Sequence, residues 1–330
     1  MNKLIVIPEL LALDWGTSSL RAFLMADGEV LETRQSPHGI QHLPMPGVPG
    51  FEKAFADIAG DWIARWPGLP VVASGMVGSA QGWKEAPYVR CPADIQTVAC
   101  QHARVASGLG PDVWIAPGVL FDEPDCLPDV MRGEEIQIAG ALLNHPEWAT
   151  RSCMVLPGTH SKWAYIENGK LVRYTTYLTG ELFAVLTQHS ILGRLILAER
   201  GSESDPAAFS LGLSTAKHSK PGDLSHQIFG TRTLGLSGRM APASLPDYLS
   251  GLLIGHELVS GMAWAGDLTD VPLVMIGEQG LCQRYTEALA AFGRRPDAIL
   301  DNTAPVGLWD FATAAGLIPG LIPGSIPSQE

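Results

Sequence analysis

The 330-residue chain lacks the long apolar runs of membrane and secreted proteins. No run reaches the roughly 18 residues that a membrane-spanning helix needs. The apolar first stretch, residues 1–13, is interrupted by Pro8 and Glu9, and no small-residue cleavage site follows it. A secretory signal is therefore not expected, and we predict a cytoplasmic protein with no membrane partner.

Cysteine and positive charge are also scarce. The chain has 5 cysteines, an odd number, and none of them stands in a CxxC pair. This usage argues against a disulfide framework and against a metal site held by cysteines, so we expect reduced, buried thiols. The formal net charge of -12 argues against nucleic acid as the main partner, because binding a phosphate backbone needs a basic face.

What the chain does have is enough apolar material for large buried sheets. Hydrophobic residues make up 46% of it and charged residues 17%, the balance of a globular protein. A length of 330 residues is long for one hydrophobic core and suits two. We expect two domains, at residues 1–150 and 151–330.

A turn with chemistry at its bend follows the first apolar stretch. Residues 10–13 and 20–25 are strand-like, and Gly16 and Ser18 between them suit a tight turn, which predicts a β-hairpin. Asp14 can hold Mg²⁺ through water, while Gly16 and Thr17 offer donors to phosphate oxygens. The alternative is an ordinary hairpin whose Asp14 caps its own turn.

Two further features of the first half point to a site. A buried strand at residues 71–76 runs into a glycine-rich loop, and α/β proteins often bind ligands in such loops. A helix is predicted to open at Gly133 with Glu134 and Glu135, which the helix dipole alone would also favour. The other expected elements are strands at 29–34 and 112–116, a helix at 51–66 and a loop at 118–129.

The second half opens with a copy of the first pattern. An apolar strand at 152–156 leads into the bend Pro157-Gly158-Thr159-His160-Ser161-Lys162 and a second strand at 163–166. Two such starts indicate an internal duplication. Further on, a strand at 271–276 runs into a glycine turn and a helix, an arrangement that serves nucleotide sites and ordinary βα units alike. The remaining expected elements are strands at 171–176 and 298–301, helices at 180–192, 245–265, 281–292 and 305–315, helical segments within 201–238, and a proline-rich tail at 318–330.

Three motifs now stand in a recognisable order: Asp14-Trp15-Gly16-Thr17, then Leu156-Pro157-Gly158-Thr159, then Met275-Ile276-Gly277-Glu278-Gln279-Gly280. Together they resemble the first phosphate, second phosphate and adenosine motifs of the superfamily of acetate and sugar kinases, heat-shock chaperones and actin. More specific stretches are similar to the 2-dehydro-3-deoxygalactonokinase family. They are Ser74-Gly75-Met76-Val77-Gly78-Ser79 with Gln81-Gly82-Trp83, Asp129-Val130-Met131-Arg132-Gly133-Glu134-Glu135, and Thr179-Gly180-Glu181-Leu182-Phe183.

The resemblance implies an α/β fold of two ribonuclease-H-like, actin-like ATPase lobes, with mixed sheets flanked by helices and a cleft between the lobes. It places a sugar-acid pocket in the first lobe and an adenosine-binding region in the second. It implies ATP with Mg²⁺ as cofactors and transfer of the γ-phosphoryl group to the 6-hydroxyl of 2-dehydro-3-deoxy-D-galactonate, in galactonate catabolism.

The resemblance also assigns the nucleotide-binding residues. Asp14 would orient Mg²⁺ through water. Backbone and hydroxyl donors of the two bends would bind the phosphates, and the glycine turn of the third motif would border the adenosine. The phosphate residues are Gly16, Thr17, Gly158 and Thr159, and the adenosine residues are Gly277, Glu278 and Gly280.

In the sugar kinases of this superfamily the catalytic base is an acid at the start of the helix before the second phosphate hairpin, where Glu134 and Glu135 stand here. Neighbouring side chains on a helix are rotated by about 100°, so both cannot face the cleft equally. Glu134, nearer the helix start, is favoured, and Glu135 stays open.

A cation should bind the substrate carboxylate, and Arg132, Arg21, Lys84 and Arg90 are the candidates. Arg132 is favoured because its planar fork matches a carboxylate and it adjoins the base. The alternative is a salt bridge from Arg132 to Asp125 or Asp129. Gly75, Met76 and Trp83 would shape the wall around the deoxygenated carbon. His160 and Lys162 lie beside the second bend and could contact phosphate or substrate, with a surface position for Lys162 as the alternative.

Two other functions remain open at this stage. One is a kinase for another sugar acid or ketose, since motifs do not report the placement of one hydroxyl. The other is a non-catalytic, actin-like sensor of nucleotide or sugar, which the absence of a basic DNA-binding extension disfavours. The oligomeric state is open too, and a homo-oligomer is compatible with the sequence.

Overall fold

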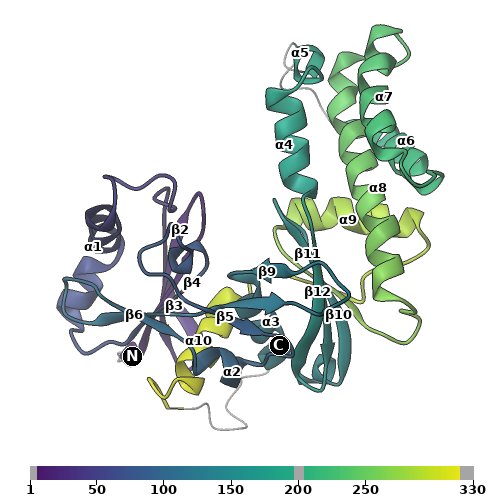
Figure 1. The fold of residues 1–330 in the computed structure, drawn as a ribbon. Helices are drawn as coiled ribbons and strands as arrows, with labels where there is room; N and C mark the ends of the chain where they lie inside the picture. The colour runs from purple at the N-terminus through teal and green to yellow at the C-terminus, as the bar shows by residue number, and fades with distance from the viewer. Residues whose placement is uncertain (1–5, 197–203, 320–330) are drawn as a thin grey trace, which may run out of the picture. The chain divides into compact units, whose positions relative to one another are not determined.

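The chain forms two units, shown in Figure 1 from a computed structural model that describes residues 6–196 and 204–319. Within the described residues, unit 1 comprises 6–150, 166–173 and 302–319, and unit 2 comprises 151–165 and 174–301. The domains expected from the sequence, at residues 1–150 and 151–330, differ from these units in the placement of two segments. Residues 166–173 and 302–319 belong with unit 1 instead.

Helix α10 explains why the last described residues join unit 1. This helix, Ala304–Ala314, packs on α3, Glu134–Asn144, through two glycines. A Cβ on Gly307 would lie 1.8 Å from Ile136 O, and a Cβ on Gly140 would lie 2.2 Å from Thr303 O. This backbone-to-backbone contact is invisible in a hydrophobic pattern, because glycines carry no apolar signal.

Unit 1 is built on a sheet of mixed direction with the strand order β3-β2-β1-β4-β7-β6. The expected hairpin is present: β1 pairs antiparallel with β2, which pairs antiparallel with β3. Strand β4 then joins parallel to β1, and β7 parallel to β4. The bounds are β1 Leu10–Trp15, β2 Leu20–Ala26, β3 Glu29–Ser36, β4 Val71–Ser74, β6 Ala103–Ala106 and β7 Asp112–Ile115.

Helix α1, Val48–Arg65, closes the apolar core of this sheet. Its buried face carries Phe51, Phe55 and Trp62, which lie in one cluster with buried strand residues such as Leu13 and Val71. The apolar spacing predicted this helix from residue 51, and the structure begins it earlier because Pro49 is tolerated in the first turn.

A small second sheet in unit 1 corrects one expectation. Residues 118–129 were predicted as a loop, but β8, Gly118–Phe121, pairs with β5, Tyr88–Arg90, and with β9, Asp129–Met131. Strands this short carry too few residues for a periodic pattern, so their existence depends on partners distant in sequence. Helix α2, Ile95–Ala99, lies nearby in sequence, and Asp94 caps it.

Unit 2 repeats the strand order of unit 1. Its sheet has the order β12-β11-β10-β13-β14, with β13 parallel to both β10 and β14. This is the order β3-β2-β1-β4-β7 of the first sheet, so the expected duplication and the α/β class with mixed sheets are confirmed. The bounds are β10 Arg151–Leu156, β11 Ser161–Glu167, β12 Lys170–Tyr177, β13 Leu273–Ile276 and β14 Ala298–Leu300.

Helices cover the rest of unit 2. The longest, α8, runs over Leu245–Ala265 as predicted and packs closely on α6, because glycines of both helices meet backbone. None of the described helices is long and apolar enough to cross a membrane. The others are α4 Thr179–His189, α5 Gly193–Ile196, α6 Pro206–Lys217, α7 Leu224–Leu236 and α9 Gln279–Ala291.

Candidate active site

Asp14 stands at the end of β1 in a setting unfavourable to its charge. Its side chain is 14% exposed and pairs with Arg21 at 3.1 Å. Burial raises the pKa of Asp14, and the Arg21 charge opposes that rise. The β1–β4 register puts Asp14 beside Ser74, whose hydroxyl is buried without a hydrogen-bond partner among the described residues. A half-buried carboxylate beside an unpaired hydroxyl suits a ligand better than a turn cap.

The turn after Asp14 uses some of its donors internally. The Gly16 N–H donates to Ser19 O at 2.9 Å, so this particular donor is committed within the turn. The carbonyls of Gly16 and Thr17 accept from the backbone of Ile40 and Gln41, each at 3.1 Å. The segment after β3 therefore fixes the turn, and Thr17 is its remaining candidate for contact with phosphate.

The start of α3 is brought to the end of β4. Gly75 has φ +92°, and a Cβ there would lie 2.8 Å from Trp15 O. Gly133 has φ +112°, and its Cβ would lie 3.3 Å from Gly75 Cα. Only glycine suits such backbone. These contacts gather the ends of β1 and β4 and the Gly133-Glu134-Glu135 turn at one edge of the unit 1 sheet.

The two glutamates of that turn have different surroundings. Glu135 is buried, accepts from the Gly133 N–H through both carboxylate oxygens at 2.9 and 2.8 Å, and borders a cavity of only about 30 Å³. Burial, with the nearby Glu134 charge, raises the pKa of Glu135 to about 8. Glu134 is half-buried and accepts from the Arg132 N–H at 3.1 Å.

Arg132 is a buried cation with unused donors. It is 9% exposed, donates from Nη2 to Ala86 O at 2.8 Å, and lies 4.3 Å over the Tyr88 ring. Its Nε and Nη1 find no hydrogen-bond partner among the described residues, and no described carboxylate lies within the 4.0 Å of an ion pair. The expected salt-bridge alternative to Asp125 or Asp129 is therefore wrong.

The other candidate cations are less suited. Arg21 pairs with Asp14, Arg90 pairs with Asp122 at 2.7 Å, and Lys84 is exposed. Buried donors left unpaired cost about 1–3 kcal/mol each, so the two free nitrogens of Arg132 indicate a missing acceptor.

The loop after β4 holds more unpaired polar atoms. Ser79 Oγ and Trp83 Nε1 are buried with no hydrogen-bond partner among the described residues. Trp83, expected in the pocket wall, packs in the core of unit 1 and is stacked on Phe51 with ring centroids 6.0 Å apart. Its place in the pocket wall stays a prediction. Met76 is half-buried in the 3-10 turn Met76–Gly78.

In unit 2 the bend at Gly158 and Thr159 packs closely against the start of α4. A Cβ on Gly180 would lie 2.5 Å from Gly158 O, and the Glu181 N–H donates to Thr159 O at 2.9 Å. The His160 ring contacts the Glu181 carboxylate. Lys162 is 4% exposed, so the surface position considered for it is wrong.

Beside this bend lies a cavity of about 570 Å³. Gly158 and Thr159 line it, as does Glu278, while Gly277 and Gly280 are not among its lining residues. Glu278 accepts from the N–H groups of Gly280 and Leu281, each at 2.9 Å, and these bonds lower its pKa. A cavity of this volume falls within the range of small-molecule sites.

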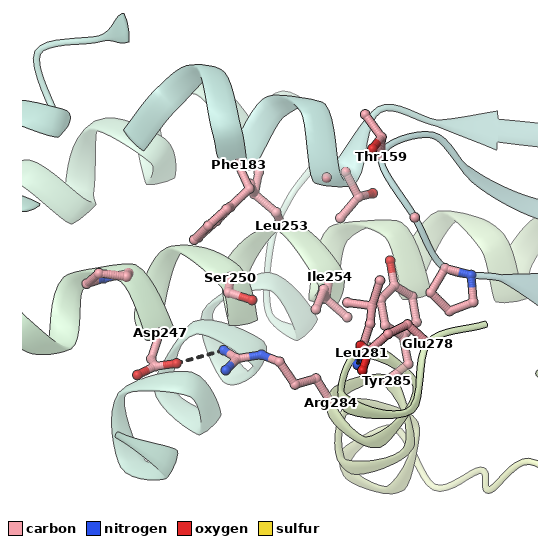
Figure 2. A pocket seen from close by; sticks show the side chains of 15 residues that line it. Thr159, Phe183, Asp247, Ser250, Leu253, Ile254, Glu278, Leu281, Arg284 and Tyr285 are labelled. Carbon is pink, nitrogen blue, oxygen red and sulfur yellow. Dashed lines mark hydrogen bonds and ion pairs between the residues drawn. The ribbon is translucent and has the colours of Figure 1, made fainter. Parts of the chain in front are cut away.

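The helices of unit 2 supply lining residues that the sequence did not identify. Figure 2 shows Phe183 projecting from α4 and, across the cavity, Arg284 of α9 bonded to Asp247 of α8. That bond is 2.8 Å long, and the Arg284 guanidinium also lies 4.5 Å from the Phe209 ring. Helix faces carry no local mark of a pocket, so the only available signal was Phe183 within the Thr179-Gly180-Glu181-Leu182-Phe183 motif.

Comparison with known proteins decides the family. The model of the family described as 2-keto-3-deoxy-galactonokinase matches residues 14–311. The chain belongs to this family. The match runs from Asp14 to α10, and the resemblance inferred from the motifs is confirmed.

Relatives of the 2-keto-3-deoxy-galactonokinase family agree over most of their length. The chain is 34% identical to the 2-dehydro-3-deoxygalactonokinase of Escherichia coli (strain K12), over 89% of this chain and 94% of that protein. A Rhizobium meliloti (strain 1021) protein named for the same activity is also 34% identical, over 90% and 94%. The crystal structure of a Sinorhizobium meliloti protein named for that activity superposes with a TM-score of 0.79 at 31% identity, covering 92% of this chain and 98% of that one.

Proposed function

We propose that this protein is an ATP-dependent kinase that phosphorylates the 6-hydroxyl of 2-dehydro-3-deoxy-D-galactonate in galactonate catabolism. The observation that carries the proposal is the family match over residues 14–311, which includes the motifs of both units. The two sites fit the two substrates: unit 1 offers carboxylates and a buried arginine, and unit 2 offers a cavity of about 570 Å³ lined largely by apolar side chains. The cleft expected between the lobes stays a prediction. The proposed reaction requires such a cleft.

The residues of unit 1 fit a Mg²⁺ ion whose ligands are mainly water and substrate phosphates. The described residues contain no group of three or more His, Cys, Asp or Glu side chains that could hold a metal. Mg²⁺ in kinases usually keeps several waters and takes one or two carboxylates together with substrate phosphates. Asp14 supplies one such carboxylate. The ion, when bound, would neutralise charge that develops on the phosphate oxygens.

The chemistry needs positioning and one proton acceptor. The 6-hydroxyl oxygen attacks the γ-phosphorus. The bond between the γ-phosphorus and the β-phosphate oxygen breaks, and ADP leaves. We assign acceptance of the hydroxyl proton to Glu134, because it is the more accessible glutamate. Thr17 and the bend at Gly158 and Thr159 would bind phosphate oxygens, and Phe183 and Arg284 would border the base in the unit 2 cavity.

Arg132→Lys should weaken binding of the sugar acid. Lysine keeps the charge but cannot offer the planar pair of donors that a carboxylate binds. We expect KM for the sugar acid to rise about tenfold or more while KM for ATP stays within twofold. Initial-rate assays with each substrate varied test this, and equal effects on both KM values would contradict the assignment. Arg90→Lys, which changes an exposed arginine, is the control.

Gly180→Ala should weaken ATP binding, since its Cβ would meet Gly158 O at 2.5 Å and displace the bend. We expect Kd for ATP to rise about tenfold and the melting temperature to fall by several degrees. Gly230→Ala is the matched control: it also lies in a helix, but its Cβ meets nothing within 4 Å. That change should stabilise slightly and leave ATP binding unaltered.

A coupled assay of ADP release tests the function itself. ATP with 2-keto-3-deoxy acids derived from galactonate and from gluconate, and with plain hexoses, should give fast turnover only with the galactonate-derived acid. A preference for another acceptor would make the protein a kinase of another sugar or sugar acid. Saturable binding of nucleotide without stimulated ADP release would indicate a sensor.

A further inference from the structure

One buried carboxylate in unit 2 takes no part in the chemistry above. Glu257, on α8, is 3% exposed. It accepts hydrogen bonds from Trp163 Nε1 at 3.0 Å, from Tyr285 Oη at 2.6 Å and from the Thr179 hydroxyl. Its surroundings therefore supply donors from β11, α9 and the first turn of α4.

Two of these donor residues also line the cavity of unit 2 in which we place the nucleotide. Thr179 and Tyr285 both line it. The Tyr285 hydroxyl also bonds to Ser161 Oγ at 3.0 Å, and the Gly158 N–H is 3.4 Å from that same Ser161 oxygen. An unbroken chain of polar contacts thus runs from Glu257 to the bend at Gly158, and it joins the bend to the cavity wall.

Stability alone is a weak reason for this arrangement. Burial raises the pKa of Glu257, which records the cost of holding its charge away from water. Well-packed apolar residues commonly stabilise a core at least as well as a buried ionic group. A polar network with all of its donors paired does, however, fix its members in one geometry.

We propose that Glu257 is a positioning residue for nucleotide binding. It holds Thr179 and Tyr285 in the wall of the cavity and, through Ser161, holds the Gly158 bend in the geometry that accepts the phosphates. The inference rests on the proposed function in one respect, namely that the unit 2 cavity takes ATP. It adds a residue that touches neither substrate.

The first test is Glu257→Gln in the full-length enzyme. The amide keeps the size but leaves one oxygen as acceptor where the carboxylate had two. We expect Kd and KM for ATP to rise about tenfold, and KM for the sugar acid to stay within twofold. Glu257→Asp, which keeps the charge on a shorter side chain, should recover part of the ATP affinity.

Variants that each remove one bond keep the inference testable if Glu257→Gln does not fold. Tyr285→Phe and Thr179→Val should each raise Kd for ATP several-fold. Combining Tyr285→Phe with Glu257→Gln should cost less than the sum of the two, because both break the same bond. Thr231→Val is the control: this threonine of unit 2 is buried, and its hydroxyl has no partner among the described residues.

The outcomes separate this inference from the proposed function. If the wild-type enzyme binds ATP and phosphorylates the sugar acid but Glu257→Gln binds ATP as the wild type does, the positioning role is wrong. Equal losses for both substrates would indicate a merely structural role and also overturn it. If the wild-type enzyme releases no ADP with any sugar acid, the proposed function fails, whereas ATP affinity measured by calorimetry still tests Glu257.

Discussion

At pH 7, Glu134→Gln should lose most turnover while Glu135→Gln should keep nearly all of it. A general base contributes about 10²- to 10⁴-fold to rate, so kcat of Glu134→Gln should fall by that order. Glutamine has nearly the size of glutamate and can still accept from the Arg132 N–H, so ATP binding should persist. The pair makes a matched comparison, because both residues lie in the first turn of α3.

The protonation state of Glu135 is the reason for its expected tolerance. With a pKa of about 8, this carboxyl is mostly neutral at pH 7, and glutamine mimics the neutral form. Its oxygens face the Gly133 N–H and a cavity of about 30 Å³, which has no room for a sugar. Geometry takes precedence over a favourable pKa when a base is assigned.

Steady-state kcat of both variants, with ATP affinity measured separately, decides the assignment. If Glu135→Gln loses turnover and Glu134→Gln keeps it, the two roles are reversed. If both retain near-normal rates, neither glutamate is the base.

Glu135 also predicts how stability depends on pH. The pKa of Glu135 is about 8 in the folded protein against 4.5 for an unperturbed glutamate, so between these values the folded state binds the extra proton. The free energy of unfolding of the wild type should therefore fall as pH rises through this window, relative to Glu135→Gln. Urea unfolding at several pH values measures the difference, and parallel pH curves for the two proteins would contradict the raised pKa.

The elements that could be predicted from sequence are those with long apolar patterns. The hairpin at Asp14 and helix α8 fall where the sequence predicted them, because both are apolar segments that the fold buries over most of their residues. The three short strands β5, β8 and β9 gave no pattern, since each depends on partners supplied by the fold. The position of α10 depends on glycine contacts that only the assembled backbone shows.

The candidate site was predictable where the backbone itself forms it. Glycines at tight approaches, such as Gly75, Gly133 and Gly180, stand within the motifs that the sequence brought out. Arg284 and Glu257, to which we assign roles, lie on helices and carry no such mark. Trp83 shows that a large aromatic residue inside a motif can also belong to the core, which the motif alone does not reveal.

Asp14→Asn should lower kcat by roughly 10²- to 10³-fold, because the neutral amide cannot support a cation that offsets charge on the transferring phosphoryl group. The fold should survive this change. The Arg21 side chain in the ion pair is 39% exposed, so solvent screens its charge and loss of the pair should cost only about 1 kcal/mol. Burial also raises the pKa of Asp14, so removal of its charge relieves a desolvation cost.

The dependence on Mg²⁺ separates a metal-orienting role from a structural one. In the wild type, Mg²⁺ should strengthen nucleotide binding and support turnover, and in Asp14→Asn the concentration needed for half-maximal rate should rise about tenfold or more. Arg21→Gln is the control, since it breaks the same ion pair but leaves the carboxylate, so it should keep the wild-type Mg²⁺ requirement. If Arg21→Gln and Asp14→Asn lose turnover equally, the ion pair itself is what the reaction needs, and Asp14 acts by holding the hairpin rather than by orienting the metal.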